Sequence, residues 1–196
     1  MKEYFDVVQE RYEKENLADV LSNPYQIINP LGFKGCLSEL ILMRKFVIFL
    51  SKSLNKSPQD LRLLDVGCGK GYILRVLAEI CGNTNNIFGT ELSKNRIEYN
   101  KRLNSNISVK YADICHDIPF DFYFDSILAF DVFMHLKTKD QIINALKNIY
   151  CQLDGGGTSF GLTRMLNPIL LMMSIRMELV FLCLRWKFLQ VMSDLK

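Results

Sequence analysis

The stretch LLDVGCGKGYIL, residues 63–74, decides the fold of this chain. Residues 61–66 form a short apolar run, which is typical of a buried strand. Gly67, Gly69 and Gly71 follow at alternate positions, and an apolar, helix-like segment comes next. Glycine lets a ligand approach the main chain closely, because it has no side chain. A strand, a glycine loop and a helix in this order predict the first half of a nucleotide-type site on a doubly wound sheet.

The spacing of the glycines distinguishes between cofactors. The dinucleotide fingerprint is Gly-x-Gly-x-x-Gly, and counted from Gly67 its third glycine would fall on Tyr72. This disfavours an NAD-type oxidoreductase. The pattern Asp-x-Gly-x-Gly-x-Gly over 65–71 instead resembles motif I of the class I S-adenosylmethionine-dependent methyltransferases, whose cofactor has no phosphate group. The resemblance implies that the cofactor lies against Asp65, Gly67, Cys68, Gly69 and Gly71.

Strand-like and helix-like segments alternate along the rest of the chain. We expect helices over 4–16, 38–54, 72–80, 94–103 and 139–151, and strands over 62–66, 86–90, 107–111, 125–130 and 158–162. A glycine-rich turn is expected at 154–157. Alternation of this kind predicts an α/β fold, a doubly wound and mostly parallel sheet with helices on both faces. The family resemblance, which covers 61–162, implies the same Rossmann-like architecture.

Further site residues follow the later strands. Glu91 comes 20 residues after Gly71, where a carboxylate suits the two hydroxyls of a ribose. The resemblance implies the same role for Glu91, with Leu92 beside it, and implies contact of Asp113 and Ile114 with the adenine. It also places Phe130 beside the methionine part of the cofactor. His135, just beyond the fourth strand, is the candidate general base for an acceptor that must lose a proton.

The two ends of the chain differ from this core. We expect a helical cap over 1–55, the cofactor-binding core over 56–162 and an apolar helical tail over 163–196, within a single domain. Members of the family usually finish with a helix and an antiparallel strand pair, so the C-terminal strands are expected to be truncated or altered. Charged residues interrupt the apolar run 166–192, which argues against a membrane span. Residues 165–196 are predicted to contact a partner protein or a membrane surface.

Composition narrows the class of protein. A net charge of +3 without a basic block does not indicate a nucleic-acid partner. The segment Phe130–Phe133 also lacks the Asn/Asp-Pro-Pro-aromatic motif of enzymes that methylate nucleobase amines. Six scattered cysteines without a Cys-x-x-Cys pair predict a reducing, cytoplasmic location and no metal site. We therefore expect a methyltransferase acting on a small molecule. The alternative is a catalytically inactive methyltransferase-fold module that binds a partner through its tail.

Overall fold

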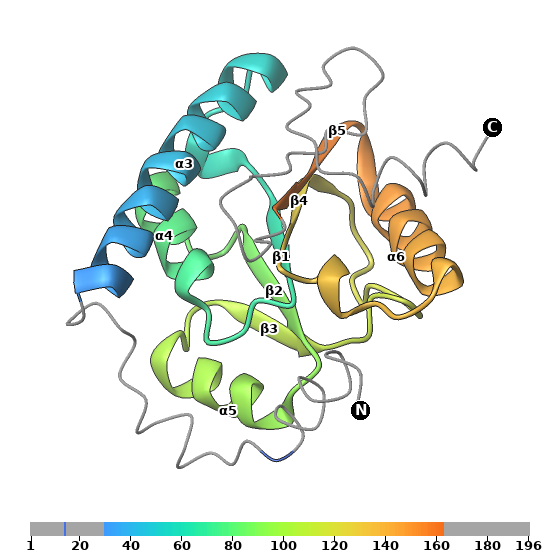
Figure 1. The fold of residues 1–196 in the computed structure, drawn as a ribbon. Helices are drawn as coiled ribbons and strands as arrows, with labels where there is room; N and C mark the ends of the chain where they lie inside the picture. Colours follow the sequence, from blue (N-terminus) through green and yellow to red (C-terminus); the bar gives the residue numbers. More distant parts are fainter. Residues whose placement is uncertain (1–13, 15–29, 163–196) are drawn as a thin grey trace.

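The computed structural model describes residue 14 and residues 30–162, which form a five-stranded sheet with helices on its two faces (Figure 1). The predicted helix over 4–16, apart from Lys14, and the tail over 163–196 lie outside the described residues. The elements are, in chain order, α3 (Pro30–Leu54), η2 (Pro58–Asp60), β1 (Leu63–Val66), α4 (Tyr72–Cys81), β2 (Ile87–Glu91), α5 (Lys94–Leu103), β3 (Ser108–Tyr111), β4 (Phe124–Phe130), η3 (Phe133–His135), α6 (Lys139–Gln152) and β5 (Leu153–Leu162).

The sheet has the strand order β3-β2-β1-β4-β5, and each pair of neighbouring strands is parallel. The central strand β1 places Asp65 between Gly89 of β2 and Leu128 of β4. Because all strands run in one direction, their carboxyl ends share one edge, the edge where α/β sheets bind ligands. The α/β fold predicted from the sequence, with its parallel sheet, is confirmed.

Two apolar cores lie on opposite faces of the sheet. Alternate residues of a strand point to opposite faces, so Leu63 joins one core and Leu64 the other. The first core holds α3 and α4 against the sheet, and Leu74 is fully buried in it. The second core holds α6, through Ala145 and Ile149. Figure 1 shows α3 and α4 on one side of the strands and α6 on the other.

Two predicted boundaries are wrong. The helix predicted to begin at residue 38 begins at Pro30, because proline fits the first turn of a helix, where its missing N–H is not needed. The last strand begins at Leu153, not at residue 158. Pairing runs from Phe124 with Leu153 directly to Ser126 with Thr158, so the glycine-rich residues 154–157 form an irregularity within β5 and not a turn before it.

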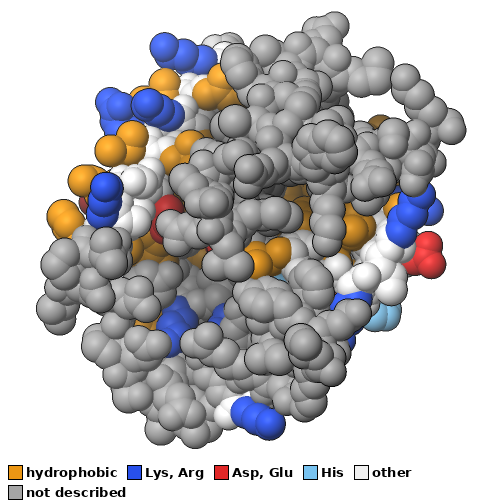
Figure 2. All heavy atoms as spheres, in the orientation of Figure 1, with side chains coloured by type: hydrophobic (Ala, Val, Ile, Leu, Met, Phe, Trp, Pro, Cys, Tyr) orange, Lys and Arg blue, Asp and Glu red, His pale blue; other side chains and the backbone are white. Residues whose placement is uncertain are grey.

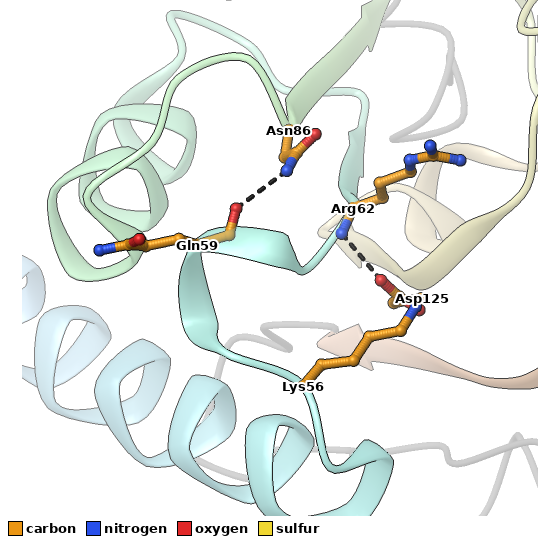
Figure 3. A network of polar contacts seen from close by, with 5 residues as sticks. All are labelled: Lys56, Gln59, Arg62, Asn86 and Asp125. Carbon is orange, nitrogen blue, oxygen red and sulfur yellow. Dashed lines mark hydrogen bonds and ion pairs between the residues drawn. The ribbon is translucent and has the colours of Figure 1, made fainter.

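A polar network fixes the edge of the sheet that lies away from the glycine loop (Figure 3). The buried carboxylate of Asp125, at the start of β4, accepts the Arg62 N–H at 2.9 Å and pairs with the Lys56 ammonium at 2.6 Å. The Asn86 side-chain amide donates to the Gln59 carbonyl at 2.9 Å. These bonds connect the segment before β1 to the starts of β2 and β4, and so hold the three central strands in register.

Among the residues that the structure describes, no helix is both long and apolar enough to cross a bilayer.

Candidate functional site

The three glycines after β1 all adopt left-handed backbone angles, with φ of +64°, +55° and +71° at Gly67, Gly69 and Gly71. This conformation favours glycine strongly. A Cβ added at Gly67 would lie 2.8 Å from the Val132 side chain, and one at Gly71 would collide with side chains of α5. Among the residues that the structure describes, a Cβ at Gly69 would meet only the Arg96 guanidinium, at 3.8 Å. Gly67 and Gly71 are therefore needed for packing, whereas Gly69 faces space that a ligand can use.

Two buried asparagines, Asn100 of α5 and Asn104 directly after this helix, hold the glycine loop. The Asn100 amide donates to the Gly69 carbonyl at 2.8 Å, and the Asn104 amide donates to the Asn100 Oδ1 at 2.6 Å. Sequence reasoning did not single out either residue. The sequence does contain a pattern that could have indicated them, because Arg96, Asn100 and Asn104 recur every four residues and so share one face of a helix.

We expect Asn100→Ala to weaken the loop without touching a ligand. The substitution removes the donor to the Gly69 carbonyl, so the free energy of unfolding should fall by about 1–3 kcal/mol. Asn86→Ala is the matched control, because it also breaks an amide-to-carbonyl bond, at the far edge of the sheet. Chemical denaturation and calorimetric titration with S-adenosylhomocysteine measure both effects. Equal losses of ligand affinity in the two variants would contradict this role for Asn100.

Glu91, at the end of β2, is buried and bonded to the glycine loop. Its Oε2 accepts the Gly69 N–H at 2.8 Å, and its Oε1 accepts the N–H groups of Leu92 and Ser93, each at 2.8 Å. Glu91 thus lies next to the glycine loop, as the sequence predicts. The same bonds occupy much of the acceptor capacity of this carboxylate, which has about four lone-pair directions.

Asp65 presents an unsatisfied buried carboxylate. The side chain is 2 % exposed, and its Oδ1 has no hydrogen-bond partner among the residues that the structure describes. Burial raises the pKa of Asp65 well above its ordinary value, and the negative charges of Glu91 and Glu39 raise it further. Such an arrangement costs free energy in the absence of a positive partner, because an uncompensated buried charge is strongly disfavoured. It therefore indicates a site for a cationic group.

Glu39 is a site residue that sequence reasoning missed. It lies half-buried on α3, three residues after Cys36, whose carbonyl accepts the Tyr72 hydroxyl at 3.0 Å. That bond ties α3 to the first residue of α4, directly after the glycine loop. The sequence offers one hint, since Glu39 shares a helix face with the buried residues Met43 and Phe46.

Cys68 holds the glycine loop through its backbone hydrogen bonds, and its side chain packs against β2. Its N–H donates to the Thr90 carbonyl at 2.9 Å, and its carbonyl accepts the Gly71 N–H at 2.8 Å. Burial, followed by the negative charges of Asp65 and Glu91, raises the pKa of the Cys68 thiol well above its usual value. The thiol therefore stays protonated and is a poor nucleophile. Gly89 is also required here, because a Cβ on it would lie 2.9 Å from the Cys68 Sγ.

Three further residues predicted to contact the cofactor lie after β2 and β3, namely Leu92 beside Glu91, and Asp113 and Ile114 at the adenine. Leu92 is exposed, and Ile114 is buried in the second core. Asp113 is half-buried, and its carboxylate accepts the Cys115 N–H at 2.9 Å and pairs with the His116 ring at 3.0 Å. Asp113 thus stabilises its own turn, whatever it binds. Contact of these residues with a cofactor remains a prediction.

Phe130 lies at the end of β4, the strand next to β1, and His135 lies beyond that strand. Phe130 ends β4 and packs on the first core, while His135 ends η3 and is half-buried. Desolvation lowers the pKa of His135, and the Asp131 and Glu91 charges oppose this in part. A lowered pKa keeps the ring neutral at pH 7 and able to accept a proton. Asp131 has a φ of +55°, a strained angle of the kind that gathers at functional sites.

Comparison with known families agrees with this geometry. Residues 63–157 match a family model described as a methyltransferase domain. These residues, just under half of the chain, are similar to a methyltransferase domain. The matched residues begin with β1 and include the glycine loop, Glu91, Asp113 and the segment from Phe130 to His135. No curated protein matches the sequence.

Solved structures share the fold of this chain at low sequence identity. The plantazolicin methyltransferase BpumL, in complex with a pentazolic desmethylPZN analog and SAH, is 16 % identical, with a TM-score of 0.62 over 82 % of this chain and 58 % of that one. SAM-bound CalS10, an amino pentose methyltransferase from Micromonospora echinaspora, is 16 % identical, with a TM-score of 0.55 over 84 % of this chain and 58 % of that one. The sugar N-methyltransferase KedS8 from Streptoalloteichus sp. is 19 % identical, with a TM-score of 0.55 over 84 % of this chain and 55 % of that one. The chain thus spans little more than half the length of each of these proteins.

Proposed function

We propose that this chain is an S-adenosylmethionine-dependent methyltransferase that acts on a small-molecule acceptor. The observation that carries the proposal is the unsatisfied, buried Asp65 carboxylate beside a glycine loop that has open space at Gly69. S-adenosylmethionine carries an ammonium and a sulfonium and no phosphate. A dinucleotide would instead bring an anionic pyrophosphate to the carboxylates of Asp65 and Glu91, where like charges repel.

The residues of the loop fit this cofactor. Asp65, with Glu39 near it, would hold the ammonium, whose positive charge compensates the buried carboxylate. Gly69 would lie against the ligand, since it is the loop glycine whose missing Cβ faces open space. BpumL and CalS10 have been solved with SAH and SAM bound, which supports the same cofactor for this chain.

Glu91 would bind the ribose hydroxyls by exchanging one of its present bonds. Two of the three backbone N–H groups that it accepts come from its own turn, at Leu92 and Ser93, and the third comes from Gly69. The Gly69 bond joins separate segments, so it is the one that we expect to yield to a hydroxyl. Leu92, Ile114 and Phe130 would supply apolar cover for the rest of the ligand.

The cofactor, when bound, supplies an electrophilic methyl group. The task left to the protein is to position the acceptor and exclude water, and a base is needed only where the acceptor must lose a proton. His135 fits that task because desolvation keeps its ring neutral. The small-molecule class of acceptor is supported by the amino pentose, sugar and plantazolicin methyltransferases that share the fold.

Calorimetric titration with S-adenosylhomocysteine, and separately with NAD, tests the proposal. We expect binding of S-adenosylhomocysteine only, with a rise in melting temperature, because a ligand that selects the native state stabilises it. Methyl transfer from labelled S-adenosylmethionine to a pool of small metabolites then tests catalysis. Binding of NAD, or no binding in a folded sample, would overturn the assignment of the cofactor. Binding without transfer to any acceptor would favour the inactive module.

A further inference from the structure

Helix α3 has two apolar faces, although it needs only one to join the domain. One face packs into the first core, through Met43, Phe46, Val47 and Leu50. The opposite face, here called the outer face of α3, is 37–53 % exposed at its large apolar residues, which are Phe33, Leu37, Leu40, Ile41, Ile48 and Phe49. Single exposed apolar residues are ordinary on a protein surface, but a continuous strip along one helix indicates an interaction surface.

The charges on the outer face are all positive. Lys34, Arg44, Lys45 and Lys52 are exposed, and at near-helical spacing they lie among and beside the apolar residues. Over 33–54, where the side chains of α3 are described, the one acidic residue is Glu39, and it is half-buried. Figure 2 shows this mixture of hydrophobic and basic side chains along the side of the molecule where α3 lies in Figure 1.

We propose that the outer face of α3 docks on an anionic lipid surface, with the helix lying in the plane of the interface. Interfacial helices combine exposed apolar residues with Lys and Arg on the adjoining face, which is the composition seen here. The apolar side chains would enter the boundary between headgroups and acyl chains, while the lysine stems extend toward lipid phosphates. This proposal is independent of the cofactor and of the catalytic activity.

The lysines favour a lipid surface over a protein partner. The buried centres of protein interfaces are depleted in lysine, because its strongly hydrated ammonium is costly to desolvate. Arg44 lies within the apolar strip, and Lys45 borders it. At a bilayer these groups stay hydrated among the headgroups, so the apolar strip can be buried without burying the charges.

Co-sedimentation of the full chain with vesicles tests the proposal. We expect binding to phosphatidylcholine vesicles that contain phosphatidylserine, weaker binding to phosphatidylcholine alone, and loss of binding as salt is raised. The triple change Lys34→Gln, Lys45→Gln and Lys52→Gln should lower the partition coefficient by about a hundredfold, given roughly fivefold for each basic residue at an anionic surface.

A triple change elsewhere provides the matched control. Lys94→Gln, Lys139→Gln and Lys147→Gln remove the same net charge from exposed lysines of α5 and α6. This variant should bind vesicles much as the parent chain does. If it loses binding as strongly as the α3 variant, net charge and not the outer face of α3 is responsible, and the proposal fails.

The apolar half of the face is tested by Ile41→Ser combined with Ile48→Ser. Ile41 is 48 % and Ile48 37 % exposed, so we expect the fold to be preserved, which circular dichroism checks. We expect vesicle binding to be lost. Retained binding would assign the membrane contact to another segment, such as residues 165–196, and overturn the proposal. Self-association that this pair abolishes, in a chain that ignores vesicles, would identify the face as a contact between two copies instead.

Discussion

Gly69→Val should lose affinity for S-adenosylhomocysteine by about one to two orders of magnitude, the cost of forcing a side chain into occupied space. In the described part of the unliganded chain, an added Cβ at Gly69 meets only the Arg96 guanidinium, at 3.8 Å. The obstacle to binding would therefore be the ligand itself. Titration calorimetry measures the change.

Gly82→Val controls for backbone strain in this experiment. Gly82 ends α4 with a φ of +64°, close to the +55° of Gly69, and a Cβ there would also have room, with Gln59 at 4.0 Å. Both variants should lose similar stability, of the order of 1–3 kcal/mol for a strained residue. Only Gly69→Val should lose ligand affinity. If both bind like the parent, the glycine loop is not the cofactor site.

Asp65→Asn should stabilise the unliganded protein and weaken cofactor binding. The amide replaces a buried, unsatisfied carboxylate, so at neutral pH the free energy of unfolding should rise by roughly 1–3 kcal/mol. The affinity for S-adenosylhomocysteine should fall by about tenfold to a hundredfold, because hydrogen bonds to charged groups contribute about 1.5–3 kcal/mol. An opposite result, lower stability with unchanged affinity, would make Asp65 a structural residue.

The stabilisation by Asp65→Asn should depend on pH in a defined direction. The pKa of Asp65 is higher in the folded than in the unfolded chain, so the folded state binds more protons between the two values. The wild-type protein therefore loses stability as the pH rises from the unfolded value, near 3.9, toward the folded one. The advantage of the asparagine should shrink as the pH is lowered through that window. Thermal melts of the two proteins at matched pH values measure it.

The order of the elements and the position of the glycine loop could be predicted from the sequence. Helix α5 lies at 94–103 as predicted, and β1, β2, β3 and β4 each lie within one residue of the prediction. These elements follow from local patterns, since a buried parallel strand is a short apolar run and a left-handed loop requires glycine. The start of α3 and the irregular β5 were missed, because Pro30 and residues 154–157 resemble breakers when read locally.

The sequence by itself determined which residue types lie at the carboxyl edge of the sheet. These are a carboxylate before the glycines, an acid at the end of β2 and a histidine after β4. Only the tertiary structure decided which of these interact. It brought Glu39 of α3 within electrostatic reach of Asp65, placed Asn100 under the Gly69 carbonyl and left the Asp65 Oδ1 unsatisfied. Contacts of this kind join residues that are far apart in the chain, and their strength depends on burial. A local sequence pattern therefore cannot predict them. The exposure of the basic and apolar outer face of α3 was also decided by the tertiary structure. The helix has apolar residues on both sides, and the packing of α4 determines which side is buried.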